Sequence, residues 1–279
     1  MAKRQRRQRD GAVFAAGLLL CACVSGCAGV GAASEDTRAA DDPVRTLRHA
    51  PEALLSAGSS QTRTAMEMAT GGTRVTIRGE GAYDFRGQLG QLTVVLPTDP
   101  AGAPEHVPIL ELLAPGALFM KHRGAGVPAD KWVRVATATL TDGNLVTGGA
   151  TDPLVAAGVL RGTRRATYLG RTEVAGVAVR HFRGTADLAL AARAASGADR
   201  AALRAAAKGF ATAQVPFDAY LDDQGRVRKL RQSFSFVNGR SRSPVAVDST
   251  TLLFAFGTRV TVTLPHARDI YTGRIAEAN

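Results

Sequence analysis

Most of the residue patterns that carry catalysis are missing from this chain of 279 residues. Its five histidines are scattered, and neither an H-E-x-x-H sequence nor a His–Cys group is present, which argues against a metal site. There is no G-x-S-x-G nucleophile turn, and the glycine-rich spots lack the lysine of a phosphate-binding loop. Aromatic residues make up only 5% and do not alternate with a basic stripe, so nucleic-acid binding is not expected. The sequence therefore predicts a protein that is not an enzyme and uses neither a cofactor nor a metal.

The N-terminal residues have the layout of a secretory signal peptide. Five basic residues between Lys3 and Arg9 precede an uncharged apolar run, 12–24, which is too short for a comfortable membrane span. The run ends in Val24-Ser25-Gly26-Cys27, which resembles the lipobox of bacterial lipoproteins: an aliphatic residue, two small residues and a cysteine. The resemblance implies cleavage before Cys27, acylation of its thiol with chains such as palmitate, and anchoring to the extracytoplasmic face of the cytoplasmic membrane. An ordinary secretory signal or a single uncleaved anchor is the alternative, although neither requires the cysteine.

Removal of the signal peptide, 1–26, would leave Cys27 as the single cysteine of the mature chain, because the other two lie inside the apolar run. With that thiol acylated, no disulfide is available, and a packed core has to stabilise the fold. The formal net charge would fall from +11 to +7. A basic protein outside the cytoplasm more often meets anionic lipid headgroups or cell-wall polymers than nucleic acid.

Residues 27–43 are small and polar, and they predict a flexible tether that lifts a folded domain from the bilayer. A single domain is expected over 44–271, followed by a short tail, 272–279. Helices are expected after Pro43 as far as Gly58, from Asp152 to Leu160, and in the alanine-rich stretch 187–212 with a break at Ser196-Gly197.

From residue 61 onward, apolar and polar residues alternate with a period of two, which is typical of half-buried strands. About ten strands in meander order are expected, at 75–86, 92–96, 117–122, 131–135, 164–173, 177–187, 215–222, 226–237, 252–256 and 260–264. The proline-rich stretch 97–108 is expected to be a loop. The economical arrangement is an α+β fold with one large antiparallel sheet and helices against one face.

Two predicted hairpins carry a family resemblance. Residues 170–187 follow the pattern G-x-x-x-V-x-G … hydrophobic-x-G-x-x-D, and residues 215–230 follow P-hydrophobic-x-x-W-hydrophobic-D-x-x-G, with Tyr220 in place of the tryptophan. Lys131-Trp132-Val133 and Phe256-Gly257-Thr258 also fit. Over most of 44–271 the chain thus resembles the actinobacterial lipoprotein family of the LppX and LprG type, whose fold is like that of LolA. The resemblance implies a half-barrel, which is a strongly curved antiparallel sheet with helices covering its concave face, and an apolar cavity for acyl chains.

Together these patterns predict a protein that binds or carries lipids or lipoglycans. Acyl chains need an enclosure because exposing them to water costs about 0.8 kcal/mol per methylene. The residues expected to line the cavity are Val75, Ile77, Tyr83, Phe85, Leu92, Val94, Phe217, Leu221, Leu230, Phe234, Leu252 and Phe254. The same residues would equally form an ordinary core, since alternation does not distinguish a filled interior from an empty one. A sensory or regulatory lipoprotein that binds an envelope protein partner, and a structural lipoprotein without a ligand, are the alternative functions.

Overall fold

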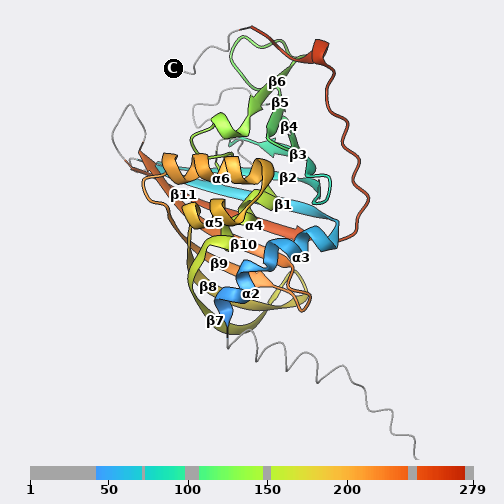
Figure 1. Ribbon diagram of the computed structural model, residues 1–279. Coiled ribbons are helices and arrows are strands. Elements are labelled where there is room, and N and C mark those ends of the chain that lie inside the picture. Colours follow the sequence, from blue (N-terminus) through green and yellow to red (C-terminus); the bar gives the residue numbers. More distant parts are fainter. Residues whose placement is uncertain (1–41, 71–72, 98–106, 147–151, 238–243, 274–279) are drawn as a thin grey trace, which may run out of the picture.

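The computed structural model describes residues 42–70, 73–97, 107–146, 152–237 and 244–273. The predicted signal peptide, Cys27, nearly all of the tether and most of the C-terminal tail lie outside the described residues. What is described forms one open sheet of eleven antiparallel strands (Figure 1). The strands are β1 (Ser59–Thr70), β2 (Thr73–Asp84), β3 (Leu89–Val95), β4 (Ile109–Ala114), β5 (Ala117–Lys121), β6 (Trp132–Ala136), β7 (Thr163–Val174), β8 (Val177–Asp187), β9 (Gln214–Leu221), β10 (Val227–Val237) and β11 (Pro244–Phe254).

The sheet consists of two meanders that meet in its middle. Its strand order is β6-β5-β4-β3-β2-β1-β11-β10-β9-β8-β7. Strands that pair in the sheet are therefore consecutive in the sequence except for β1 and β11, and the consecutive strands β6 and β7 lie at opposite edges. That central pair runs in register from Gln61 opposite Phe254 to Ala69 opposite Ala246. The first and last strands of the chain therefore join an N-terminal half, β1–β6, to a C-terminal half, β7–β11.

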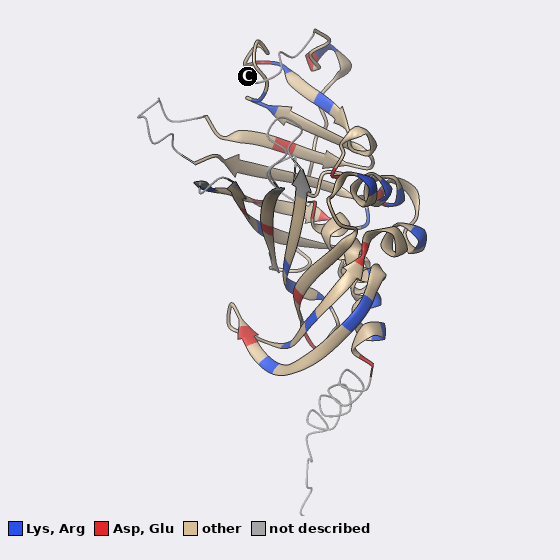
Figure 2. Ribbon diagram, turned by 90° about the vertical axis from the view of Figure 1, so that its left-hand side faces the viewer, with Lys and Arg blue, Asp and Glu red and all other residues tan. Residues whose placement is uncertain are grey.

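Five helices lie on one face of the sheet, α2 (Pro43–Arg48), α3 (Ala50–Ala57), α4 (Pro153–Gly158), α5 (Leu188–Ala194) and α6 (Gly197–Gly209) (Figure 1). The sheet curls toward them, and β7 and β8 sweep around beneath the helices in the turned view (Figure 2). The helix-bearing face is thus the concave face. This confirms the predicted fold class, a large curved antiparallel sheet with helices covering the concave face.

Local sequence explains where the helices begin. Asp152 accepts hydrogen bonds from the backbone N–H groups of Leu154 (2.9 Å) and Val155 (3.2 Å), with Pro153 in the first turn of α4. Asp187 caps α5 in the same way through the N–H of Leu190 (2.8 Å). All six residues of α4 are buried, because α4 lies within the layer between the sheet and the other helices.

The helices do not cover the concave face evenly. α2 packs on β7, α3 on β1 and β10, α4 on β10 and α5 on β8, whereas α6 packs on the other helices and on the segment after β6. That last contact is close: a Cβ on Gly143 (φ +59°) would lie 2.0 Å from the carbonyl oxygen of Ala202 in α6. The helices therefore fill the C-terminal half of the concave face and leave the far end of the N-terminal half without a helical cover.

Three segments differ from the sequence prediction, the first being β1, which was not among the ten expected strands. β4 was not expected, because its sequence ILELLA does not alternate and follows a proline-rich stretch. The predicted strand 260–264 is wrong: this part forms an extended strap without a strand partner. The strap, 255–273, leaves β11, crosses the strand ends beside Ser59 and reaches β6, where Tyr271 donates a backbone hydrogen bond to Trp132 (2.8 Å).

The strap also covers a second, smaller apolar cluster on the outer face of the sheet. Leu112, Ala117 and Phe119 are buried there, with Trp132 from β6 and Val262 and Ile270 from the strap packed against them. Among the alternating residues of 260–264, Val262 packs on this cluster, whereas Leu264 of the same parity is 39% exposed, so the alternation here does not mark a strand.

Candidate functional site

The structure separates the twelve predicted cavity residues into two groups. Ten lie on the concave face in the main core, where Val75 is half-buried and the rest are buried. Leu252 and Phe254 are half-buried on the opposite, outer face, because β11 turns Val247 and Leu253 toward the helices and its even positions outward.

In the C-terminal half the concave face is filled by side chains. Phe217, Leu221, Leu230 and Phe234 from the sheet share one continuous core with buried residues of the helices. Phe234 stacks on Phe210 with ring centroids 4.8 Å apart. Packing of this kind stabilises the fold, and these four residues belong to a closed core here.

In the N-terminal half the concave face is hollowed into an apolar groove. The groove has a volume of about 570 Å³ and lies between β2–β6 and the turn after β5. Its lining consists of Ile77, Leu96, Ile109, Met120, His122, Arg123, Gly124, Ala125, Val133 and Val135. An adjoining hollow of about 330 Å³ shares five of these residues and extends the groove along the turn to Ala129. Ligand pockets in proteins have volumes of this order and are mostly apolar with a few polar groups.

The rim of the groove carries its polar groups. His122 has a left-handed backbone (φ +62°), and its Nδ1 lies 3.1 Å from the carbonyl oxygen of Pro108. Arg123 is half-buried beside it, and no carboxylate among the described residues forms an ion pair with its guanidinium. The mouth of the groove is therefore positively charged.

A buried carboxyl group lies next to this groove. Glu111 of β4 is fully buried on the concave face, between Leu92 of β3 and Met120 of β5. Neither of its carboxyl oxygens has a hydrogen-bond partner among the described residues. Burial raises the pKa of Glu111 from 4.5 to about 8, although the positive charge of Arg123 opposes the shift. The carboxyl is consequently protonated at neutral pH.

A second carboxyl, that of the half-buried Asp152, lies under the helices and is, by contrast, well partnered. Besides capping α4, Asp152 accepts a hydrogen bond from the hydroxyl of Tyr83 (3.3 Å). Burial raises the pKa of Asp152 from 3.8 to about 6, with a contribution from the negative charge of Asp199 and opposition from the capping hydrogen bonds. Tyr83, a predicted cavity residue, thus anchors α4 to β2.

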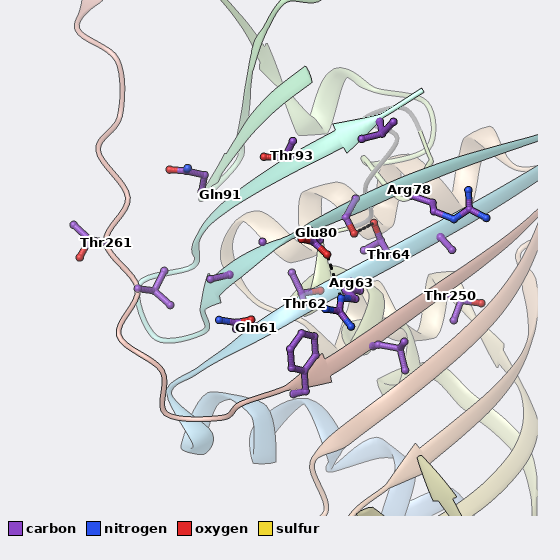
Figure 3. Close-up of a pocket in the computed structure, with 18 of the residues that line it drawn as sticks. Gln61, Thr62, Arg63, Thr64, Arg78, Glu80, Gln91, Thr93, Thr250 and Thr261 are labelled. Carbon is purple, nitrogen blue, oxygen red and sulfur yellow. Dashed lines mark hydrogen bonds and ion pairs between the residues drawn. The ribbon is translucent and has the colours of Figure 1, made fainter. Parts of the chain in front are cut away.

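The outer face has a larger and more polar hollow of about 860 Å³ (Figure 3). It lies between the strap and strands β1, β2, β3 and β11, and Gln61, Gln91, Thr93, Thr250 and Thr261 contribute polar atoms to it. Arg63 is paired with Glu80 (3.2 Å) and lies 4.9 Å over the ring of Phe254. Leu252 and Phe254 line this hollow rather than the groove.

Neither hollow contains an arrangement typical of metal binding. In the ranges that the structure describes, no three His, Cys, Asp or Glu side chains are grouped so that they could hold a metal ion. None of the described helices is both long and apolar enough to cross a membrane.

Sequence reasoning missed the residues that make the groove distinct, apart from Ile77. Its floor comes from β4 and β5 and its rim from the turn at 122–125, neither of which alternates clearly. One signal was available: a single glutamate inside the apolar run 109–113 is an unusual residue for a buried strand.

No family model matches this chain, and no curated protein matches it in sequence. Among solved structures, LppX of Mycobacterium tuberculosis is similar with 10% identity and a TM-score of 0.45, over 80% of this chain and all of LppX. LprF of Mycobacterium bovis is similar with 14% identity and a TM-score of 0.42, over 81% of this chain and 97% of LprF. MucB of Pseudomonas aeruginosa in complex with MucA is similar with 13% identity and a TM-score of 0.31, over 82% of this chain and 63% of the MucB chain. LppX belongs to the family that the hairpin motifs resemble, and at these values the likeness is one of overall architecture alone.

Proposed function

We propose that this protein is a membrane-anchored, extracytoplasmic lipoprotein that binds the acyl chain of a lipid or lipoglycan in the apolar groove over β2–β6. The observation that carries the proposal is the groove itself: an apolar hollow of about 570 Å³ on the concave face, where the helices leave the sheet uncovered. A chain of sixteen carbons left in water would cost roughly 12 kcal/mol, so its transfer into such a groove is strongly favoured.

The rim of the groove suits an anionic headgroup. Arg123 is half-buried at the mouth and has no ion-pair partner among the described residues, and a guanidinium binds phosphate or carboxylate with two parallel hydrogen bonds. The positive net charge of the mature chain would also favour binding to a membrane surface with anionic lipid headgroups.

The proposed anchor is the acyl group on Cys27. About fifteen small and polar residues would separate Cys27 from Pro43, where α2 begins, and a flexible chain of that length lets the groove face the lipid layer. Replacement of Cys27 by alanine should abolish incorporation of a clickable palmitate analogue and release the protein from the membrane fraction. Retention of label by the variant would contradict the anchor.

The groove is tested by purifying the full-length chain in detergent and measuring bound lipid by native mass spectrometry. We expect the native chain to retain lipid and the variant Val135→Trp, which fills the groove from a half-buried position, to lose it. Val95→Trp is the matched control, because Val95 is 51% exposed on the outer face. Equal lipid retention in both variants would contradict the groove as the binding site.

The alternative, a non-enzymatic lipoprotein that binds a protein partner, is favoured by the outer hollow. That hollow is larger and mixed in polarity, as peptide-binding surfaces are. The same pair of variants distinguishes the two functions, since a partner seated on the outer face would be displaced by Val95→Trp and not by Val135→Trp.

A further inference from the structure

A small cavity lined by polar groups lies where α6 meets the segment after β6. Its volume is about 10 Å³, which is the room that one water molecule or one ion needs. Tyr83 of β2, Asn144 after β6, Asp152 at the start of α4 and Asp199 in the first turn of α6 all line it. Four separate segments of the chain therefore bring polar side chains to one point.

Asn144 indicates that the small cavity holds a ligand. Its side chain is 1% exposed, and neither Oδ1 nor Nδ2 of its amide forms a hydrogen bond with the described residues. A buried amide without hydrogen bonds costs free energy, and native proteins rarely leave one unpaired. A ligand that binds the amide oxygen would recover part of that cost.

The two carboxylates of the small cavity are only partly neutralised. Oδ1 of Asp152 caps α4, whereas its Oδ2 has the hydroxyl of Tyr83 as its partner, at 3.3 Å. Asp199 is half-buried and forms no hydrogen bond or ion pair with the described residues. The positive charge that acts on Asp199 is that of Arg161, which is itself paired with Glu52 (3.1 Å). Two negative charges therefore face the cavity.

We propose that the small cavity binds one calcium ion. Calcium takes six to eight oxygen ligands, among them carboxylates, amide carbonyls and backbone carbonyls, and it accepts flexible geometry. Asp152, Asp199 and Asn144 would supply two carboxylates and an amide oxygen, and the turn 114–116 lines the same cavity with its backbone. The charge of the ion would balance the two carboxylates, whereas a water molecule would leave both charges in place.

A calcium ion at this position would fix the helical cover. It would join α4 and α6 to β2 and to the segment after β6, and α6 otherwise packs on that segment and on the other helices. This inference does not depend on the proposed lipid binding, because the small cavity and the groove share no lining residue.

The test is a calorimetric titration of the full-length chain with calcium chloride. The chain is purified in dodecyl maltoside, stripped with a chelator and dialysed at pH 7. We expect one ion per chain and a dissociation constant of about 0.1–1 mM, as in extracellular calcium-binding modules. Calcium chloride at about 10 mM should raise the melting temperature by roughly 3–10 °C.

Three variants assign the ion to the small cavity. Asp199→Asn should weaken calcium binding at least about tenfold, because it removes one of two charges. Asn144→Gly, which suits the left-handed backbone (φ +66°) and removes the amide, should also weaken it. Asn144→Asp adds a third carboxylate and should tighten binding about tenfold. Asp223→Asn, an exposed aspartate between β9 and β10, is the control and should bind calcium as the native chain does.

The outcomes separate an ion site from a cavity that holds only water. No calcium binding by the native chain would overturn the proposal. Native affinity in both Asp199→Asn and Asn144→Asp would also overturn it, because the ion would then lie elsewhere. Tighter binding by Asn144→Asp would support it, since a purely structural role of Asn144 would not produce that gain.

Discussion

The two halves of the concave face use the same alternating strands for different purposes. Over β7–β11 the helices add buried leucines, alanines and Phe210, and the interior is closed. None of the described helices lies over the far end of β2–β6, and an apolar groove remains there. The buried Glu111 lies next to it, opposite the groove residue Met120. The comparison shows that strand alternation defines which face is apolar, whereas the cover determines whether that face becomes a core or a binding site.

The largest effect should come from truncating the covered half. Phe182 of β8 is fully buried with its ring 5.4 Å from that of Tyr168, so Phe182→Ala should lower the free energy of unfolding by about 3–5 kcal/mol. Val135→Ala in the groove should lower it by less than about 1.5 kcal/mol, because its side chain is only partly packed. Denaturant unfolding measures both, and equal losses would remove the distinction between the halves.

The unpartnered carboxyl of the open half should weaken the fold at neutral pH. Because the pKa of Glu111 is about 8 in the folded chain and 4.5 is its ordinary value, the unfolded chain loses its proton first. The free energy of unfolding should thus fall as the pH rises from about 4.5 to about 8 and then level off. Glu111→Gln should remove this slope and be more stable above pH 8, by up to roughly 4 kcal/mol. A parallel pH profile for both proteins would contradict the burial of an ionisable group there.

The partnered carboxyl of the covered half should show a smaller effect at lower pH. The pKa of Asp152 is raised from 3.8 to about 6, so stability should fall between about pH 4 and 6 and be constant above. Asp152→Asn keeps an oxygen for the cap of α4 and should be more stable at pH 7 by roughly 2–3 kcal/mol. Asp152→Ala, which removes the cap, serves as the comparison. A less stable Asp152→Asn would mean that the charged form is favoured beneath the helices.

The smallest change in stability is expected on the outer face, which forms neither the closed core nor the groove. Val262→Ser removes one apolar contact between the strap and the outer cluster and should lower stability by about 1 kcal/mol. Leu264→Ser on the same strap, at a side chain exposed to 39%, should have no measurable effect. A thermal shift assay separates the two, and identical melting temperatures would show that the strap does not dock through Val262.

Much of the fold was predictable because it is local. Turn residues and a period of two placed β7–β10 within a few residues, and Asp152 and Asp187 are capping residues whose helices begin where the sequence indicated. The resemblance of the hairpins also anticipated the curvature and the side on which the helices lie.

The groove was not predictable from the sequence, because it exists where the helices do not cover the sheet. The sequence of β4 does not alternate between apolar and polar residues. In β11, apolar residues occur on both faces of the strand, so the sequence does not show whether Leu252 and Phe254 point to the concave or the outer face. The strap has apolar residues at alternate positions, of which Val262 packs on the outer cluster. This alternation led to the wrong prediction of a strand at 260–264. Such features follow from long-range packing, for which a single sequence carries little signal.

The most direct test of the account is to locate a bound acyl chain by photocrosslinking. A phosphatidylglycerol with a diazirine in one chain is bound to the full-length protein, irradiated and mapped by peptide mass spectrometry. We expect adducts on the groove residues Ile109, Met120 and Val133. Adducts confined to Leu252 and Phe254 in the outer hollow, or to the helices α2–α6, would contradict it.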